Sequence, residues 1–271
     1  MIGTGVGRTV AGWRDALART LVRAHVTPNI LTLAGTAATV AAGFCLALGA
    51  GAHFGPTLSA GSLRRYDPNA WTALAFLLLF LSAASDMLDG AVARLAGQAS
   101  TFGAFLDSTL DRLSDFAIFT GIAFYFVARG NLTYALLPGL CIFWGLMISY
   151  TRARAEDLIQ FCTVGYWQRG ERMAAVLIAV LAHNIPALLW QQATLPALTV
   201  WARIRYTYAA AHGLTYVTDP RQGSALDRLK LWRYPRGTLA YDLVTGANIL
   251  WLILAPLSSQ ADPLGAALGL K

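Results

Sequence analysis

The sequence has few charged residues for its length. Only 13% of its 271 residues are Asp, Glu, Lys or Arg, whereas soluble globular domains contain about 25%. By contrast, 56% of the residues are hydrophobic and the mean hydropathy is +0.51. This composition argues against a water-soluble enzyme and against a disordered chain, and it predicts an integral membrane protein.

Cysteine is also scarce. The three cysteines, Cys45, Cys141 and Cys162, each lie in or beside an apolar segment, and no CxxC pair is present. This pattern excludes a disulfide framework and a cysteine metal site, and small apolar packing roles account for these residues. The four histidines are scattered and show no HExxH spacing.

Acidic residues are outnumbered, with 14 Asp and Glu against 21 Lys and Arg, for a net charge of +7. The basic residues lie mostly between apolar segments, as positive-inside topology and anionic lipid headgroups require. One side carries Arg8, Arg14, Arg19, Arg23, Arg94, Arg152, Arg154, Arg169, Arg172, Arg203, Arg205 and the basic residues of 207–238; the other carries Arg64, Arg65, Arg129 and Lys271. We assign the first side to the cytoplasmic face of the cell membrane in a multi-pass protein.

The long apolar segments predict an all-α fold. Crossing a bilayer core of ~30 Å takes about 20 helical residues, and the candidate segments are 29–52, 70–95, 103–128, 132–152, 171–186, 187–206 and 239–258. Pro186 and Pro196 interrupt the fifth and sixth segments, which membrane helices tolerate where neighbours satisfy the freed carbonyls. The last segment either spans, which places the C-terminus outside, or lies at the interface, which keeps it inside.

The N-terminal residues predict a helix on the membrane surface. Within 6–25, Val6, Val10, Trp13 and Leu17 recur at helical spacing among arginines, which is typical of an interfacial amphipathic helix. A solvated helix is the alternative.

Five of the 14 acidic residues fall between positions 86 and 115: Asp86, Asp89, Asp107, Asp111 and Asp115. Asp86 and Asp89 are three apart and Asp107 and Asp111 are four apart, so each pair shares a helix face. The connection over 96–102 is short, which makes the two helices antiparallel neighbours. Four carboxylates are therefore expected to converge at one depth, just inside the cytoplasmic surface.

Carboxylates at bilayer depth are costly and require compensation. Aspartate oxygens suit hard cations such as Mg²⁺ or Mn²⁺, which often take phosphate oxygens as further ligands. Small residues around the acids would leave room for a ligand or for close helix packing: Gly90, Ala91, Ala93, Gly97, Gly103 and Ala104. We therefore predict a divalent-metal site that accepts phosphates. The alternative is that arginines neutralise the acids and only stabilise helix packing.

The same residues carry a family resemblance. The segments DMLDGAVAR, from Asp86, and GAFLDSTLD, from Gly103, are separated by eight residues. They resemble the motif D-x2-D-G-x2-A-R-x8-G-x3-D-x3-D of the CDP-alcohol phosphatidyltransferases at every fixed position. Thr27-Pro28-Asn29 before the first span is also similar. The resemblance covers about 20–206 and implies a transmembrane six-helix core behind an amphipathic helix.

The resemblance also implies a reaction, in which an alcohol attacks the lipid-linked phosphorus of a CDP-lipid and CMP leaves. By position, it implies that Asp86, Asp89 and Asp107 are metal ligands and that Asp111 lies at or beside a second metal and acts as general base. It further implies that the CDP moiety is bordered by Gly90, Ala93, Arg94 and Gly103. Two Mg²⁺ or Mn²⁺ ions and a homodimer are expected.

Two further segments bear on the acceptor alcohol. SYTRARAE at 149–156 and RGER at 169–172 resemble the branch that makes inositol-phosphate phospholipids, the bacterial phosphatidylinositol phosphate synthases and their archaeal counterparts. The resemblance implies that arginines hold the acceptor phosphate, with Arg154 and Arg172 first, then Arg112, Arg152 and Arg169. Glycerol 3-phosphate is the alternative acceptor, and ordinary positive-inside flanks are the alternative role of any one arginine. Since Arg152 and Arg154 point to different sides of a helix, one of them could instead meet lipid headgroups or Glu171.

The expected organisation has four parts. An amphipathic cytoplasmic segment at 1–28 precedes a transmembrane catalytic domain at 29–206. A basic cytoplasmic loop follows at 207–238, with a DPRQG turn at 219–223 and at most one short helix, and an extra transmembrane segment with a tail occupies 239–271. Two other classes of protein are alternatives, an ion or proton-coupled transporter and a non-catalytic membrane scaffold. A proton relay would spread its acids along the membrane normal, whereas here they lie at one depth.

Overall fold

The computed structural model describes residues 2–50, 70–213 and 224–270, with the backbone alone for 2–11 and 225. Several predictions therefore fall outside the described residues or side chains: Arg64, Arg65, Lys271, the DPRQG turn at 219–223, and the side chains of Val6, Arg8 and Val10. The described part of the chain contains helices and no strands, as expected. The chain divides into two compact units, with the boundary within α4 (Thr101–Val127).

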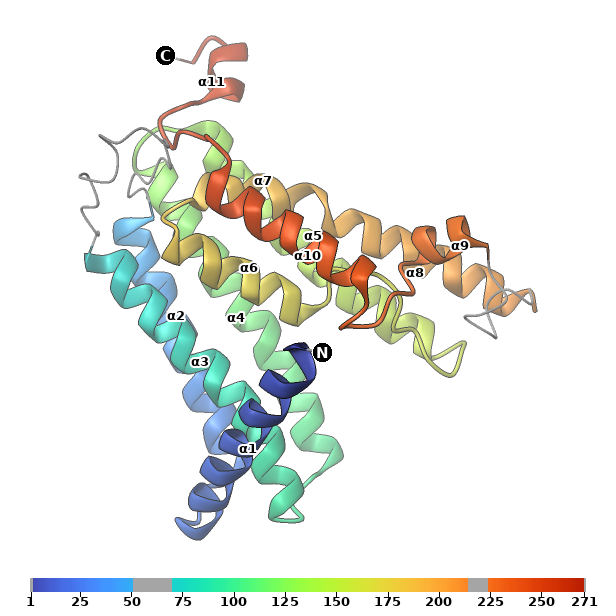
Figure 1. Ribbon diagram of the computed structural model, residues 1–271. Coiled ribbons are helices and arrows are strands. Elements are labelled where there is room, and N and C mark those ends of the chain that lie inside the picture. Colours follow the sequence, from blue (N-terminus) through green and yellow to red (C-terminus); the bar gives the residue numbers. More distant parts are fainter. Residues whose placement is uncertain (1, 51–69, 214–223, 271) are drawn as a thin grey trace. The chain divides into compact units, whose positions relative to one another are not determined.

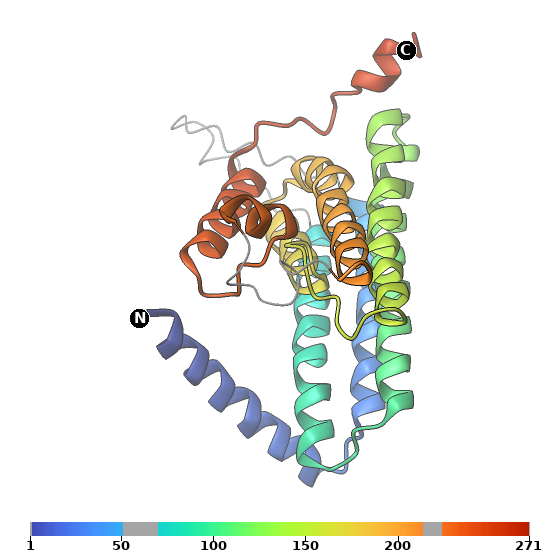
Figure 2. The same cartoon turned by 90° about the vertical axis from the view of Figure 1, so that its right-hand side faces the viewer.

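The first unit contains α1 (Ile2–Arg23), α2 (Pro28–Gly49), α3 (Ala70–Leu95) and α4 as far as Ile122. Helices α2 and α3 lie side by side, and α1 runs obliquely to α3 (Figures 1 and 2). Ala18 of α1 is fully buried against Ala91 and Val92 of α3. The exposed side chains of Trp13 and Leu17 lie elsewhere on α1, so the predicted helix has one face packed against protein and apolar residues left to meet a membrane surface.

Two glycines allow α2 and α4 to meet backbone to backbone. A Cβ atom on Gly43 would lie 2.5 Å from the carbonyl oxygen of Ala117, and a Cβ on Gly121 would collide with the carbonyl oxygen of Gly43. Helices of membrane proteins approach this closely where small residues remove the side-chain layer. The contact fixes α4, and with it the second aspartate pair, against α2.

The second unit contains the end of α4 and α5 (Leu132–Glu156), α6 (Arg169–Leu181), α7 (Ile185–Thr194), α8 (Pro196–Ala211), α9 (Ala225–Leu231), α10 (Leu239–Leu254) and α11 (Pro263–Ala267). Helix α5 packs against α7 and α8, and α10 lies along α6 (Figure 1). Asp262, before α11, accepts hydrogen bonds from the backbone N–H groups of Leu132 and Thr133 at 3.0 and 2.9 Å. The C-terminal segment is thereby tied to the start of α5.

The helix lengths correct part of the predicted span list. Among the described residues, α2, α3 and α5 are long and apolar enough to cross a membrane. Helix α4 has 27 residues, which is long enough to span, but it carries four charged residues and is not among these apolar helices. The charged residues are Asp107, Asp111, Arg112 and Asp115. Helix α10, with 16 residues, is apolar but shorter, so both the spanning and the interfacial alternatives for it stay open.

The fifth and sixth predicted spans differ most from the structure. Helix α6 has only 13 residues and ends at Leu181, because His183 adopts a left-handed conformation and Asn184 caps α7. The expected continuous helix over 187–206 is instead α7 and α8, which divide at Leu195. Pro196 has no backbone N–H to donate and occupies the first turn of α8, where proline is tolerated.

Candidate active site

A pocket of about 240 Å³ in the first unit brings together both halves of the aspartate motif. It lies where the start of α2, the end of α3, the connection to α4 and the first turns of α4 meet. Its lining is Pro28, Asn29, Thr32, Asp89, Gly90, Ala93, Arg94, Gln98, Ala99, Ser100, Gly103, Ala104 and Asp107. The four residues expected to border the CDP moiety are thus beside two of the expected metal ligands.

Hydrogen bonds between α2 and α3 hold the first aspartate pair. The hydroxyl of Thr32 donates to Oδ2 of Asp89 at 2.9 Å, and Asp89 is 9% exposed. One turn earlier on α3, the Ser85 hydroxyl donates to the carbonyl oxygen of Leu31 at 2.7 Å. Hydrogen bonds to an ionised carboxylate are among the stronger ones in proteins, so Thr32 orients Asp89.

Glycines make room for these polar groups. A Cβ atom on Gly35 would lie 3.5 Å from Oδ1 of Asp86. A Cβ on Gly103 would lie 3.0 Å from Oγ of Ser100 and 3.6 Å from Oδ1 of Asn29, and the Gly103 N–H donates to that Ser100 hydroxyl at 3.0 Å. The backbone of α4 can therefore approach the start of α2 closely at the pocket.

Two further aspartates of α4, Asp111 and Asp115, follow Asp107 and do not line the pocket. Asp111 and Asp115 are both buried and are 9% and 7% exposed. Arg112 lies 3.8 Å from a carboxylate oxygen of each. Asp86 and Asp111 are not among the residues that line the pocket. Arg112, predicted to bind the acceptor, contacts the acids of its own helix in this structure.

The carboxylates suit a divalent cation by their chemistry. Asp86 and Asp107 each lie close enough to Asp89 to act electrostatically on it. Within the described part of the chain, no three His, Cys, Asp or Glu side chains are arranged closely enough to hold a metal ion. Mutual repulsion separates like charges, whereas a hard cation favours their convergence. The donor type fits Mg²⁺ or Mn²⁺, and the roles of the individual aspartates stay predictions.

The two arginines at the end of α5 are paired with acids of the same segment. Nε of Arg152 lies 2.9 Å from Glu156, and Nη1 of Arg154 lies 2.7 Å from Asp157. All four side chains are at least one-third exposed, and such surface pairs contribute little net free energy. Both guanidiniums can therefore exchange these partners for a phosphate.

Arg169 and Arg172 occupy the first turn of α6 and are three residues apart, so they share a helix face. Arg172 is buried, with 6% exposure. Glu171, between them, accepts hydrogen bonds from Arg236 at 2.7 and 2.9 Å and from the Tyr241 hydroxyl at 2.8 Å. The acid that could have met Arg152 or Arg154 is thus bound by residues from farther along the chain.

Sequence reasoning missed the role of Arg203. It counted this residue as a positive-inside flank, yet Arg203 is 1% exposed and donates to Gln168 Oε1 at 2.7 Å and to the carbonyl oxygens of Val164 and Ile148. The position of this arginine within the apolar run LTVWARI could have indicated that it is buried. Its fork of donors joins α8 to α5 and to the segment before α6.

Comparison with known proteins identifies the family. The family model for CDP-alcohol phosphatidyltransferase matches residues 25–209. The chain belongs to this family. It is therefore a phosphotransferase enzyme that uses a CDP-linked donor and an alcohol acceptor, and the transporter and scaffold alternatives are wrong. Helices α9, α10 and α11 lie after the matched range.

Several relatives have names from one branch of the family. The phosphatidylinositol phosphate synthase of Cutibacterium acnes is 37% identical over 175 residues, which cover 63% of this chain and 74% of that protein. The archaetidylinositol phosphate synthase of Pyrococcus horikoshii is 34% identical over 191 residues, which cover 70% and 88%.

A solved structure supports the fold. The Mycobacterium tuberculosis phosphatidylinositol phosphate synthase with CDP-DAG bound aligns with a TM-score of 0.58 at 26% identity, over 72% of this chain and 93% of that one. A second structure of that enzyme, in complex with manganese and citrate, aligns with a TM-score of 0.57 at the same identity over 72% and 88%. The expected all-helical membrane fold is confirmed.

Proposed function

We propose that this enzyme transfers the phosphatidyl or archaetidyl group of a CDP-lipid to inositol phosphate, with release of CMP. The observation that carries the proposal is the pocket of the first unit, where Asp89 and Asp107 lie beside Gly90, Ala93, Arg94 and Gly103. Residues from both halves of the motif share one cavity, which a reaction on a metal-bound pyrophosphate requires. The names of the relatives favour inositol phosphate over glycerol 3-phosphate.

Each aspartate has a proposed task. Asp86, Asp89 and Asp107 would hold a divalent ion, with Asp111 at or beside a second one. When bound, Mg²⁺ or Mn²⁺ would neutralise the pyrophosphate and stabilise charge on the attacking and leaving oxygens. Asp111 would accept the proton of the acceptor hydroxyl, which requires hydrogen-bond reach to that hydroxyl. A manganese-bound relative agrees with a metal of this type.

The nucleotide end of the donor would lie along the small residues. Gly90 and Gly103 present backbone without side chains to the pocket, so phosphates and cytidine can approach closely. Arg94 would donate to phosphate oxygens. Ala93, one turn after Gly90 on α3, adds only a methyl group to the same side of the pocket.

Arginines of α5 and α6 would bind the acceptor phosphate. Arg154 and Arg172 are first, with Arg112, Arg152 and Arg169 in support. The side chain of Arg154 is 65% exposed and its ion pair with Asp157 is at the surface, where such pairs contribute little net free energy, so a phosphate could replace Asp157. Arg169 and Arg172 would present two guanidiniums from one face of α6.

The topology and assembly are part of the same proposal. The arginines that the sequence assigns to the first side favour an active site at the cytoplasmic face of the cell membrane. We likewise propose the domain boundaries at 28, 206 and 238. A homodimer is also proposed, since the family resemblance implies a two-subunit enzyme.

The deciding experiment measures CMP release from CDP-diacylglycerol with inositol phosphate, glycerol 3-phosphate or free inositol as acceptor. Mass spectrometry of the lipid product identifies the transferred headgroup. We expect inositol phosphate to be used and free inositol to be used poorly. Equal use of free inositol, or a preference for glycerol 3-phosphate, contradicts the proposed acceptor while leaving the family reaction intact.

Arginine variants test how the acceptor is held. Arg154→Ala and Arg172→Ala should raise the apparent KM for inositol phosphate by roughly ten- to a hundredfold, the value of one charged hydrogen bond. The apparent KM for the CDP-lipid should hardly move, because metal holds its pyrophosphate. Arg129→Ala is the matched control, since Arg129 lies over the Tyr125 ring on the opposite predicted side. An unchanged acceptor KM in both variants would show that these arginines do not bind the acceptor and only contribute to the positive-inside topology.

A further inference from the structure

Residues 224–254, which follow the matched family range, are hydrogen-bonded to the segment before α6 and to α7. The Gly165 N–H donates to the carbonyl oxygen of Leu231 at 3.2 Å, and the Tyr166 hydroxyl lies 2.9 Å from that of Thr245. Farther along α10, Trp251 donates through Nε1 to the carbonyl oxygen of Ala187 at 3.1 Å. The segment 224–254, which we call the C-terminal extension, is thus an integral part of the second unit.

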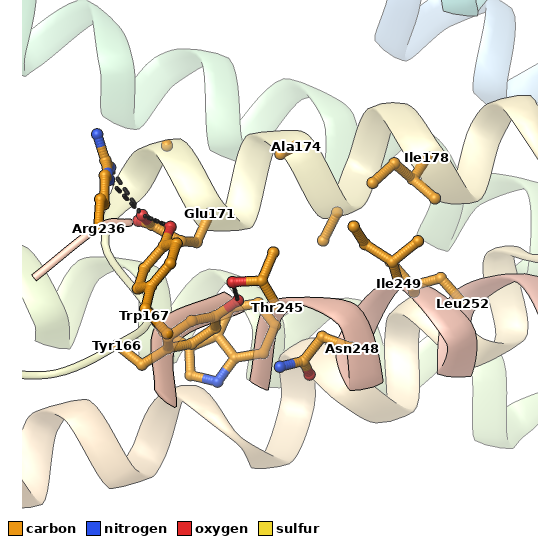
Figure 3. A pocket seen from close by; sticks show the side chains of 13 residues that line it. Tyr166, Trp167, Glu171, Ala174, Ile178, Arg236, Thr245, Asn248, Ile249 and Leu252 are labelled. Carbon is orange, nitrogen blue, oxygen red and sulfur yellow. Dashed lines mark hydrogen bonds and ion pairs between the residues drawn. The ribbon is translucent and has the colours of Figure 1, made fainter. Parts of the chain in front are cut away.

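The extension meets α6 at the RGER turn. Arg236 donates through Nε and Nη2 to Oε1 of Glu171 (Figure 3). The hydroxyl of Tyr241 donates to the same oxygen. Arg236 also lies over Gly170, because a Cβ atom there would be 3.2 Å from its Nη2. These contacts lie at one end of a cavity of about 280 Å³ between α6 and α10, whose other end is apolar around Ile178, Ile249 and Leu252 (Figure 3).

Glu171 needs this neutralisation. Its side chain is 7% exposed, and its second oxygen, Oε2, is buried without a hydrogen-bond partner in the described part of the chain. A buried carboxylate is costly unless a cation and donors compensate it. The N-terminal turn of a helix favours a negative charge, but Arg236 supplies the formal positive charge. The attraction of Glu171 correspondingly raises the pKa of Arg236.

We propose that Arg236 and Tyr241 of the C-terminal extension are positioning residues for the acceptor: they neutralise and hold Glu171, so that the positive field of Arg169 and Arg172 is available to the acceptor phosphate. The inference rests on the proposed function, since it takes those two arginines as the phosphate-binding pair. Glu171 lies between them in the same helical turn. Without Arg236, the negative charge of Glu171 would lie in the same helical turn as the two arginines and would oppose the binding of a dianionic phosphate by them.

The experiment is a pair of single variants and their double variant. Arg236→Gln should raise the apparent KM for inositol phosphate by roughly tenfold, about the value of one charged hydrogen bond, with kcat and the KM for CDP-lipid nearly unchanged. Glu171→Gln removes the opposing charge and should leave the acceptor KM equal or lower. The double variant Glu171→Gln/Arg236→Gln should return the acceptor KM to near the parent value. Tyr241→Phe should give a smaller increase of the same kind.

The control is Lys230→Gln, which removes one positive charge from an exposed position of the same extension and should leave the acceptor KM unchanged. An unchanged acceptor KM in Arg236→Gln overturns the inference. So does a raised KM that the double variant fails to restore, because Arg236 would then bind the acceptor directly or serve the fold alone. If the parent enzyme does not use inositol phosphate, the proposed function fails first, and the acceptor panel shows this separately.

Discussion

Thr32 on α2 donates a hydrogen bond of 2.9 Å to Oδ2 of Asp89 on α3, and Asp89 is buried with 9% exposure. The same hydroxyl also lies 3.2 Å from the carbonyl oxygen of Pro28, so its single hydrogen is shared between the two acceptors, with the shorter contact to Asp89. One hydroxyl therefore links the first turn of α2 to a proposed metal ligand on α3.

Replacing this hydroxyl should weaken the metal site. Thr32→Val keeps the shape of the side chain but leaves Oδ2 of Asp89 without its donor, a loss of about 1.5–3 kcal/mol for a charged group. We expect CMP release at limiting Mg²⁺ to fall by tenfold or more and to recover partly at saturating Mg²⁺. Titration of activity against Mg²⁺ measures the shift. Thr32→Ser, which retains the hydroxyl, should behave like the parent, and a Thr32→Val enzyme with an unshifted metal titration would contradict the orienting role.

Activity should require a divalent cation and the aspartates together. Asp86→Asn and Asp107→Asn each remove one charged ligand and should reduce CMP formation by orders of magnitude while the helical circular dichroism is retained. The matched control is Asp157→Asn, at an exposed surface pair outside the motif. CMP formation that continues in excess EDTA would refute the metal assignment.

Asp111 should act on the chemical step rather than on donor binding. If it accepts the proton of the acceptor hydroxyl, Asp111→Asn should bind CDP-lipid with near-parent affinity and turn over very slowly. Nucleotide binding by calorimetry, compared with that of Asp86→Asn, separates the roles. A loss of binding as large as that of Asp86→Asn would make Asp111 mainly a metal ligand.

Asp262 predicts a pH-dependent attachment of the C-terminal segment. It accepts hydrogen bonds from the N–H groups of Leu132, Thr133 and Gly265 and from the Thr133 hydroxyl at 2.6 Å, and these hold the pKa of its carboxyl well below the usual range. Because the folded-state pKa is depressed, this stabilisation is present above the unfolded pKa of about 3.9 and is lost as pH falls through the folded-state value.

Hydrogen exchange measures this effect. At neutral pH, Asp262→Asn should speed exchange at the first amides of α5 and in α11 and leave α2 and α3 unchanged. In the parent protein, the same amides should stay protected from neutral pH down to about pH 4 and lose protection in stronger acid. Equal protection of α11 in the parent and in Asp262→Asn would show that the carboxylate does not anchor the segment.

The sequence by itself determined the membrane class, the helical fold and the family reaction. Apolar runs of about 20 residues with little charge satisfy their backbone groups in lipid as helices, and the aspartate spacing defines shared helix faces through local geometry alone. The family match over 25–209 agrees with the motif read from the residues. Helix starts and stops followed equally local rules at Pro28 and Pro196.

Tertiary structure decided which partner each charge takes. Arg203 turned inward to carbonyl oxygens, and Glu171 paired with Arg236, 65 positions away. No periodicity encodes such pairs, because they depend on which helices pack together and on where burial forces a charge to find a donor. The hydrogen bond from Thr32 to Asp89 likewise arises from packing between segments far apart in the chain.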